Sequence, residues 1–186
     1  MNAKCNLVTV LLLCCLIFPG NAQEFNWQDL VNRKQYAAVI ARADSLTPAD
    51  SSDYEVMNAI GQAYEGMLRY RQAYDYYRLC LSIDTTNLDI LNTLARTATN
   101  LGKAKDAERY FHKVLAADSL NFYANYQLAR LYFQLGEYER AVDTYEKLQA
   151  RNEDNTALYR AIGDCYSRLE QYPSATIAYF QAYNLN

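Results

Sequence analysis

The chain has 186 residues, of which 51% are apolar, 13% are aromatic and 21% are charged. This length suits one ordinary domain, and the apolar share is enough for a continuous core. The formal charge of −3 gives no basic face of the kind that nucleic-acid binding needs, so we expect no nucleic-acid partner. Glycine (6) and proline (3) are scarce, which disfavours a sandwich or barrel with many tight turns.

Residues 1–22 have the order of a secretory signal peptide and are set aside from the fold. A positive start at Lys4 precedes an apolar run from Leu7 to Phe18, and small residues lie just ahead of Gln23. A permanent membrane span needs about 20 apolar residues, so this run is too short. We expect cleavage near Gln23, a periplasmic or secreted protein of a bacterium, and membrane contact only through this segment. An uncleaved anchor and a cytosolic location are the alternatives.

Residues 23–53 are predicted to form an irregular helical hairpin. A short first helix is expected over residues 25–31. Tyr36 and Val39 are spaced for one face of a second helix, which should end before Thr47-Pro48. We interpret this segment as a degenerate first unit that covers the end of the repeats that follow it.

From residue 54 onward the sequence repeats every 34 residues. The four units are 54–87, 88–121, 122–155 and 156–186. Three columns of equivalent residues define them: an aliphatic column (Ile60, Leu94, Leu128, Ile162), an alanine column (Ala73, Ala107, Ala141, Ala175) and an aromatic column (Tyr77, Phe111, Tyr145, Tyr179). The spacing within each unit predicts two helices that approach closely at small residues, with the aromatic ring filling the space beside them.

Turn and cap residues separate these helices. Gly102 and Gly136 predict the tight turn within two units, because glycine tolerates the left-handed conformation at a helix end. Pro173 is placed for the first turn of the last helix, where its missing N–H costs little. The polar segments 84–87 and 118–121 supply stop and cap chemistry between units.

The columns resemble the tetratricopeptide repeat family. The fit is best in the last unit, which reads Tyr159-x-x-Ile162-Gly163-x-x-Tyr166. Unit 88–121 departs from the family pattern at Ala98, which stands in place of a tyrosine. The resemblance implies an all-α fold, a right-handed α-solenoid of helix-turn-helix repeats, which holds a protein or peptide partner.

Stacks of this family line a concave groove with their first helices. The resemblance implies that the groove residues are Asn58, Gln62, Asn92, Arg96, Tyr123, Tyr126, Arg130, Phe133, Arg160 and Arg168. Tyr126 and Phe133, with Tyr123, predict an aromatic shelf of the kind favoured at interface hot spots. Arg96 and Arg130 lie one unit apart and should project side by side. We hypothesise an extended peptide with an acidic or carboxylate group near these arginines; a solvated inner wall is the alternative.

No constellation in the sequence indicates an enzyme. His112 is the only histidine, and it falls on the outer face of a second helix without a second histidine or a mature cysteine nearby. We find no phosphate-binding loop or hydrolase motif, so we expect no catalysis, metal or cofactor. Cys80 and Cys165 are separated by four predicted helices, farther than the about 7 Å that a disulfide allows, and are expected in the core.

The last unit carries an apolar pair where the earlier units carry polar or charged side chains. Ile177 and Phe180 replace these outer residues: Asp75, Arg78, Arg109, His112, Asp143 and Glu146. We expect Ile177 and Phe180 to form a docking surface, for a homodimer or for a C-terminal extension, with a frayed terminus as the alternative. The predicted function is an exported interaction scaffold. The alternative is a sensory or adaptor segment of a larger envelope signalling or assembly protein.

Overall fold

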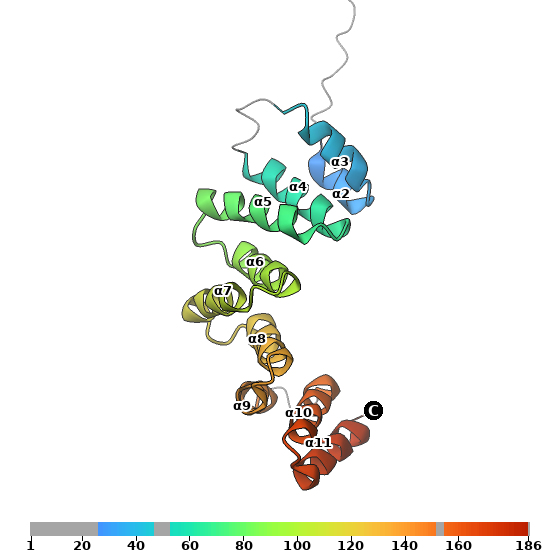
Figure 1. Cartoon of the computed structure of the whole chain (residues 1–186), viewed down its shortest axis with the longest axis vertical. Coiled ribbons are helices and arrows are strands. Elements are labelled where there is room, and N and C mark those ends of the chain that lie inside the picture. Colours follow the sequence, from blue (N-terminus) through green and yellow to red (C-terminus); the bar gives the residue numbers. More distant parts are fainter. Residues whose placement is uncertain (1–25, 47–52, 152–154, 186) are drawn as a thin grey trace, which may run out of the picture.

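The computed structural model describes residues 26–46, 53–151 and 155–185. Within these ranges the chain is all-α, with ten helices and no strand, which confirms the predicted fold class (Figure 1). The predicted signal peptide, residues 1–22, lies outside them. None of the described helices is both long and apolar enough to cross a membrane.

The described helices form antiparallel hairpins, each made of a first and a second helix. These are α2 (Trp27–Asn32) with α3 (Tyr36–Ala43), α4 (Tyr54–Gly66) with α5 (Tyr70–Ile83), α6 (Leu88–Asn100) with α7 (Ala104–Ala117), α8 (Phe122–Gln134) with α9 (Tyr138–Gln149), and α10 (Thr156–Arg168) with α11 (Tyr172–Asn184). Each hairpin packs on the hairpins next to it in the sequence, so the stack steps along one axis from α2 to α11 (Figure 1). The core is therefore a row of similar interfaces rather than one central cluster.

The first helices of the last four hairpins begin at equivalent capped positions. The side chains of Asp53, Asn87, Asn121 and Asn155 each accept a hydrogen bond from backbone N–H groups in the first turn. The Oδ1 of Asn87, for example, lies 3.0 Å from the backbone nitrogen of Ile90. These bonds satisfy N–H groups that a helix start leaves without a partner, so the predicted caps are confirmed.

The turn inside every hairpin contains one residue in the left-handed conformation. Their φ values are 57° at Lys34, 60° at Leu68, 70° at Gly102, 79° at Gly136 and 59° at Glu170. The two predicted glycine turns are confirmed, and three turns use residues that lack the freedom of glycine. Because all five positions are 34 residues apart, the hairpin of α2 and α3 is in register with the regular repeats.

A side-chain contact supports this register. Gln28 of α2 and Gln62 of α4 are equivalent residues, and the Nε2 of Gln28 donates to the Oε1 of Gln62 at 3.4 Å. Equivalent positions on successive first helices therefore lie next to each other, even in the irregular first unit.

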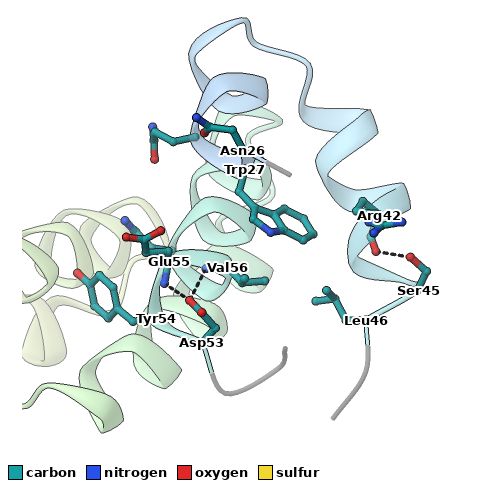
Figure 2. Close-up of a pocket in the computed structure, with 11 residues that line it drawn as sticks. Asn26, Trp27, Arg42, Ser45, Leu46, Asp53, Tyr54, Glu55 and Val56 are labelled. Carbon is teal, nitrogen blue, oxygen red and sulfur yellow. Dashed lines mark hydrogen bonds between the residues drawn. The ribbon is translucent and has the colours of Figure 1, made fainter. Parts of the chain in front are cut away.

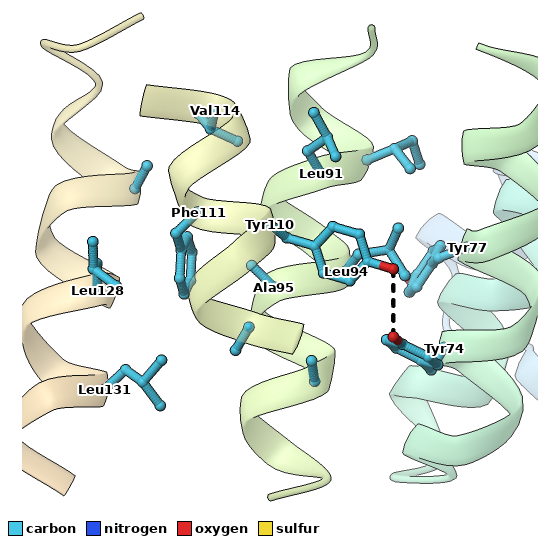
Figure 3. Packing of buried hydrophobic residues seen from close by; sticks show 14 of the residues in the cluster. Tyr74, Tyr77, Leu91, Leu94, Ala95, Tyr110, Phe111, Val114, Leu128 and Leu131 are labelled. Atoms are coloured by element: carbon cyan, nitrogen blue, oxygen red, sulfur yellow. Dashed lines mark hydrogen bonds between the residues drawn. The ribbon is translucent and has the colours of Figure 1, made fainter. Parts of the chain in front are cut away.

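The repeat columns form the core. Ile60, Leu94, Leu128 and Ile162 are all at most 4% exposed. In the aromatic column Tyr77 packs directly over Gly61, since a Cβ on this glycine would lie 2.7 Å from the ring. Figure 3 shows such layers in succession, with side chains of α5, α6, α7 and α8 packed between one another. Equal spacing in the sequence thus produces equal environments in space.

The last residue of the aromatic column lies outside the core, whereas both described cysteines lie inside it. Tyr179 is the last residue of the aromatic column and remains 40% exposed, because no described helix packs on its outer side. Cys80 and Cys165 are completely buried free thiols, as expected for small core residues rather than a disulfide. Burial raises the pKa of Cys80 to about 11 and that of Cys165 to about 12.

Candidate binding groove

Three cavities follow one another along the first helices. The first, of about 390 Å³, lies between α4 and α6; the second, of about 160 Å³, between α6 and α8; and the third, of about 320 Å³, is bounded by α8, α9 and α10. The first two share Arg96, and the last two share Arg130 and Gln134. Because neighbouring cavities share lining residues, the three form one row, which we call the groove, and Arg96 and Arg130 both line its middle cavity.

The first cavity contains a closed ionic cluster. The guanidinium of Arg96 lies 2.5 and 2.9 Å from the two carboxylate oxygens of Glu65, and the hydroxyl of Tyr77 donates to the same carboxylate at 3.0 Å. Burial has the largest single effect on the pKa of Arg96 and lowers it, but the charge and hydrogen bond of Glu65, together with nearby tyrosines, raise that pKa overall. Burial and the same carboxylate raise the pKa of Tyr77. Arg96 is therefore already neutralised within the protein.

The charge environment of Arg130 differs from that of Arg96. Its side chain is exposed, and its Nη1 donates to the amide oxygen of Gln127 at 3.2 Å. The structure records no carboxylate salt bridge for Arg130 among the described residues. Of the two arginines that line the three cavities, Arg130 is therefore the one whose charge a ligand can meet.

Aromatic rings form the wall next to Arg130. Tyr126, Phe133 and Tyr145 line the third cavity together with Asp164. The rings of Tyr126 and Tyr145 meet edge to face, with centroids 5.6 Å apart. The predicted aromatic residues Tyr126 and Phe133 thus lie on one cavity, whereas Tyr123, 40% exposed, is not among the residues that line it.

The other predicted groove residues are placed as follows. Asn58 and Gln62 line the first cavity. Asn92 is half-buried, and its Oδ1 has no hydrogen-bond partner in the described chain. Arg160 is exposed on α10, and the guanidinium carbon of Arg168 lies 5.9 Å from the ring centroid of Phe133.

A larger cavity, of about 760 Å³, lies at the N-terminal end and shares Asn58 with the groove (Figure 2). Trp27 points into it from α2, and Leu46 and Val56 face it from the other side. Leu46 and Asp53 stand at the two ends of residues 47–52, which lie outside the described chain.

The pairing of Glu65 with Arg96 is the main feature that sequence reasoning missed. The two residues are 31 apart, which is three less than one repeat. The repeat equivalent of Arg96 on α4 is Gln62, and Glu65 lies about one helical turn after Gln62. Glu65 therefore faces Arg96 on the next first helix, α6. A search for opposite charges at that spacing would have found the pair.

His112 lies outside the groove, on the second helix α7. His112 is exposed, and its Nε2 lies 3.7 Å from the carboxylate of Glu108. In the part of the chain that the structure describes, no three His, Cys, Asp or Glu side chains are grouped to hold a metal ion.

Family models place this chain among known repeats. Two models, both of the tetratricopeptide repeat, match residues 54–87 and 101–165. No curated protein matches the chain in sequence.

Solved structures of similar fold include two of MamA, both 19% identical to this chain. Their TM-scores are 0.76 and 0.75; each match covers 86% of this chain, and 93% and 89% of the MamA chains. YrrB, a "TPR protein with an unusual peptide-binding site", is 18% identical at a TM-score of 0.73, over 86% of this chain and 82% of its own. At these identities the likeness concerns the fold alone.

Proposed function

Because the chain is a tetratricopeptide repeat protein, we propose that it is an exported scaffold that holds an extended peptide in the groove of its first helices. The row of three adjacent cavities carries this proposal, since the first and second share Arg96 and the second and third share Arg130. A peptide in extended conformation advances about 3.3 Å per residue, so a short segment suffices to cross adjacent units. YrrB, with a similar fold, is a peptide-binding protein by its own description.

The chemistry of the third cavity defines the ligand more closely. Three aromatic side chains offer an apolar surface for one side chain of the peptide, and beside it lies Arg130, for which the described residues show no salt bridge. Asp164 adds an acceptor, although it already accepts from the hydroxyl of Tyr179 at 2.8 Å. The preferred segment therefore carries an apolar side chain near a carboxylate, which Arg130 binds.

The structure changes the original two-arginine hypothesis. Arg96 holds Glu65 in a bidentate pair, so a ligand carboxylate near Arg96 would compete with a carboxylate that is already in place. We accordingly place the carboxylate site at Arg130. Arg96, held by Glu65, lines the first two cavities without binding the ligand carboxylate.

The test is recovery of partners from native extract by the purified chain, measured by quantitative mass spectrometry. An Arg130→Ala variant should lose about tenfold or more of its recovered partner, because hydrogen bonds to charged groups contribute about 1.5–3 kcal/mol. Arg78→Ala removes an arginine from the exposed outer side of α5 and is the matched control. Unchanged recovery with Arg130→Ala would end the proposal for the carboxylate site.

The role of Arg96 needs a balanced substitution. Arg96→Ala alone would leave the largely buried Glu65 carboxylate unpaired, so loss of binding would be mixed with loss of stability. The double variant Glu65→Gln with Arg96→Gln removes both charges together. It should recover partners much as the wild type does, whereas a tenfold loss would show that Arg96 binds the ligand directly.

Export is proposed from the order of residues 1–22 alone. N-terminal sequencing of the protein purified from its native host should begin at Gln23. A mature protein that begins at Met1 would refute cleavage.

A further inference from the structure

The helix α11 differs from every other second helix of the regular units. From Tyr172 to Asn184 it contains no charged residue, whereas α5, α7 and α9 each carry both acidic and basic side chains. Four large side chains of α11 are more than half exposed: Tyr172 (62%), Ile177 (61%), Phe180 (62%) and Tyr183 (76%). An apolar helix surface without charge is typical of a contact with another protein.

The earlier units show which part of this surface a further repeat would cover. On α5, Tyr74 and Tyr77 are at most 3% exposed under the next hairpin, while Asp75 and Arg78 remain exposed on the outer side. The outer positions of α7 and α9 are exposed in the same way.

On α11 the covered positions correspond to Thr176 and Tyr179, and the outer ones to Ile177 and Phe180. A further repeat packed like the earlier ones would therefore leave Ile177 and Phe180 uncovered. Their exposure needs a different partner.

We propose that this partner is a second copy of the chain, which packs its own α11 against this α11 about a two-fold axis. In a two-fold contact the same surface faces itself, so both copies must bury any charge that it carries. The uncharged α11 has no charge to remove from water, unlike the equivalent surfaces of α5, α7 and α9.

The exposed area fits the same partner. With a large side chain contributing about 200 Å² when fully buried, the four exposed side chains of α11 amount to roughly 500 Å² per copy. Two copies together reach about 1,000 Å², the smallest area expected of a biological interface. A lipid surface fits less well, because membrane-surface helices carry lysine and arginine on their polar face and α11 has neither.

The test is the mass of the full chain in solution, measured by light scattering after gel filtration over a range of concentrations. The wild type should be a dimer, and the double variant Ile177→Asp with Phe180→Asp should be a monomer. Loss of one hot-spot side chain weakens an interface about 30-fold, and each substitution occurs twice in the dimer, so the Kd should rise at least about 1,000-fold.

A matched control separates this contact from general loss of surface hydrophobicity. Leu79 and Ile83 are an apolar pair on α5, 48% and 49% exposed. Their double aspartate variant should remain a dimer. Circular dichroism should show that both variants keep the helical content of the wild type, since all four side chains lie at the surface.

Three results would overturn the proposal. The first is a monomeric wild type at all concentrations. The second is a dimer that survives both aspartates on α11. The third is binding of the wild type to phosphatidylglycerol vesicles that is abolished by the same aspartates, which would assign the surface to lipid.

Discussion

The left-handed residue in each turn allows a quantitative test of the repeat geometry. Glu170 has a φ of 59°, a conformation that costs a residue with a Cβ about 1–2 kcal/mol. Replacing Glu170 with glycine removes this strain but adds about 0.5–1 kcal/mol of chain entropy to the unfolded state. Because Glu170 is exposed, little packing is lost. The free energy of unfolding should rise by about 0.5–1 kcal/mol.

The same calculation gives a different answer at Leu68. Its φ is 60°, but it is 70% exposed, so about a third of the side chain is buried. Removing that part costs about 0.5–1 kcal/mol, since complete burial of a leucine contributes about 1.5–3 kcal/mol. Leu68→Gly should therefore be close to neutral.

Gly102→Ala is the reverse control. A Cβ at Gly102 would meet nothing within 4 Å, so its effect comes from the backbone alone, at φ 70°. Alanine adds the strain but also lowers the entropy of the unfolded chain, so we expect a net loss of about 0.5–1 kcal/mol.

Urea denaturation followed by far-UV circular dichroism measures all three variants. For a chain of this length a change of 1 kcal/mol also shifts Tm by about 2–4 °C. If Glu170→Gly lowers the free energy of unfolding, or Gly102→Ala leaves it unchanged, then strain from the left-handed conformation does not control the stability of these turns.

The remaining predictions concern the core. Gly61→Ala should lower the free energy of unfolding by about 1–3 kcal/mol, because its Cβ would lie 2.7 Å from the buried ring of Tyr77. Gly163→Ala would place a Cβ 2.6 Å from the ring of Tyr179, but this ring is 40% exposed and can move. Gly163→Ala should therefore lower the free energy of unfolding less than Gly61→Ala does, and equal losses in urea would contradict this reasoning. Burial raises the pKa of Cys80 from 9.0 to about 11 and that of Cys165 to about 12, so both should resist alkylation by iodoacetamide near pH 8 until urea is added, as peptide mass spectrometry would show. The thiols lose their protons at a lower pH in the unfolded chain than in the folded one. Their contribution to the free energy of unfolding is therefore complete below pH 9 and should decline as the pH rises toward 11–12. A free energy of unfolding that does not change over this pH range would argue against burial.

The sequence alone determined the period, the helices and the core of this protein. Each hairpin is specified by local chemistry: a cap such as Asn87, small residues such as Gly61, and an aromatic residue such as Tyr77 that fills the space they leave. Because every unit repeats this pattern at the same spacing, the environment of one unit predicts that of the next. Even the irregular hairpin of α2 and α3 follows the period, with Lys34 at its turn.

The tertiary structure decided which charges and surfaces of these units are available to a ligand. Arg96 and Arg130 are equivalent in the sequence, but Arg96 is neutralised by Glu65 from the preceding unit, whereas the structure records no such partner for Arg130 among the described residues. Likewise, the sequence placed Phe180 on the outer side of its helix, but the packing of the earlier units was needed to show that a further repeat would leave it uncovered. Such features depend on side chains meeting across units, and a column of equivalent residues does not record which neighbours they meet.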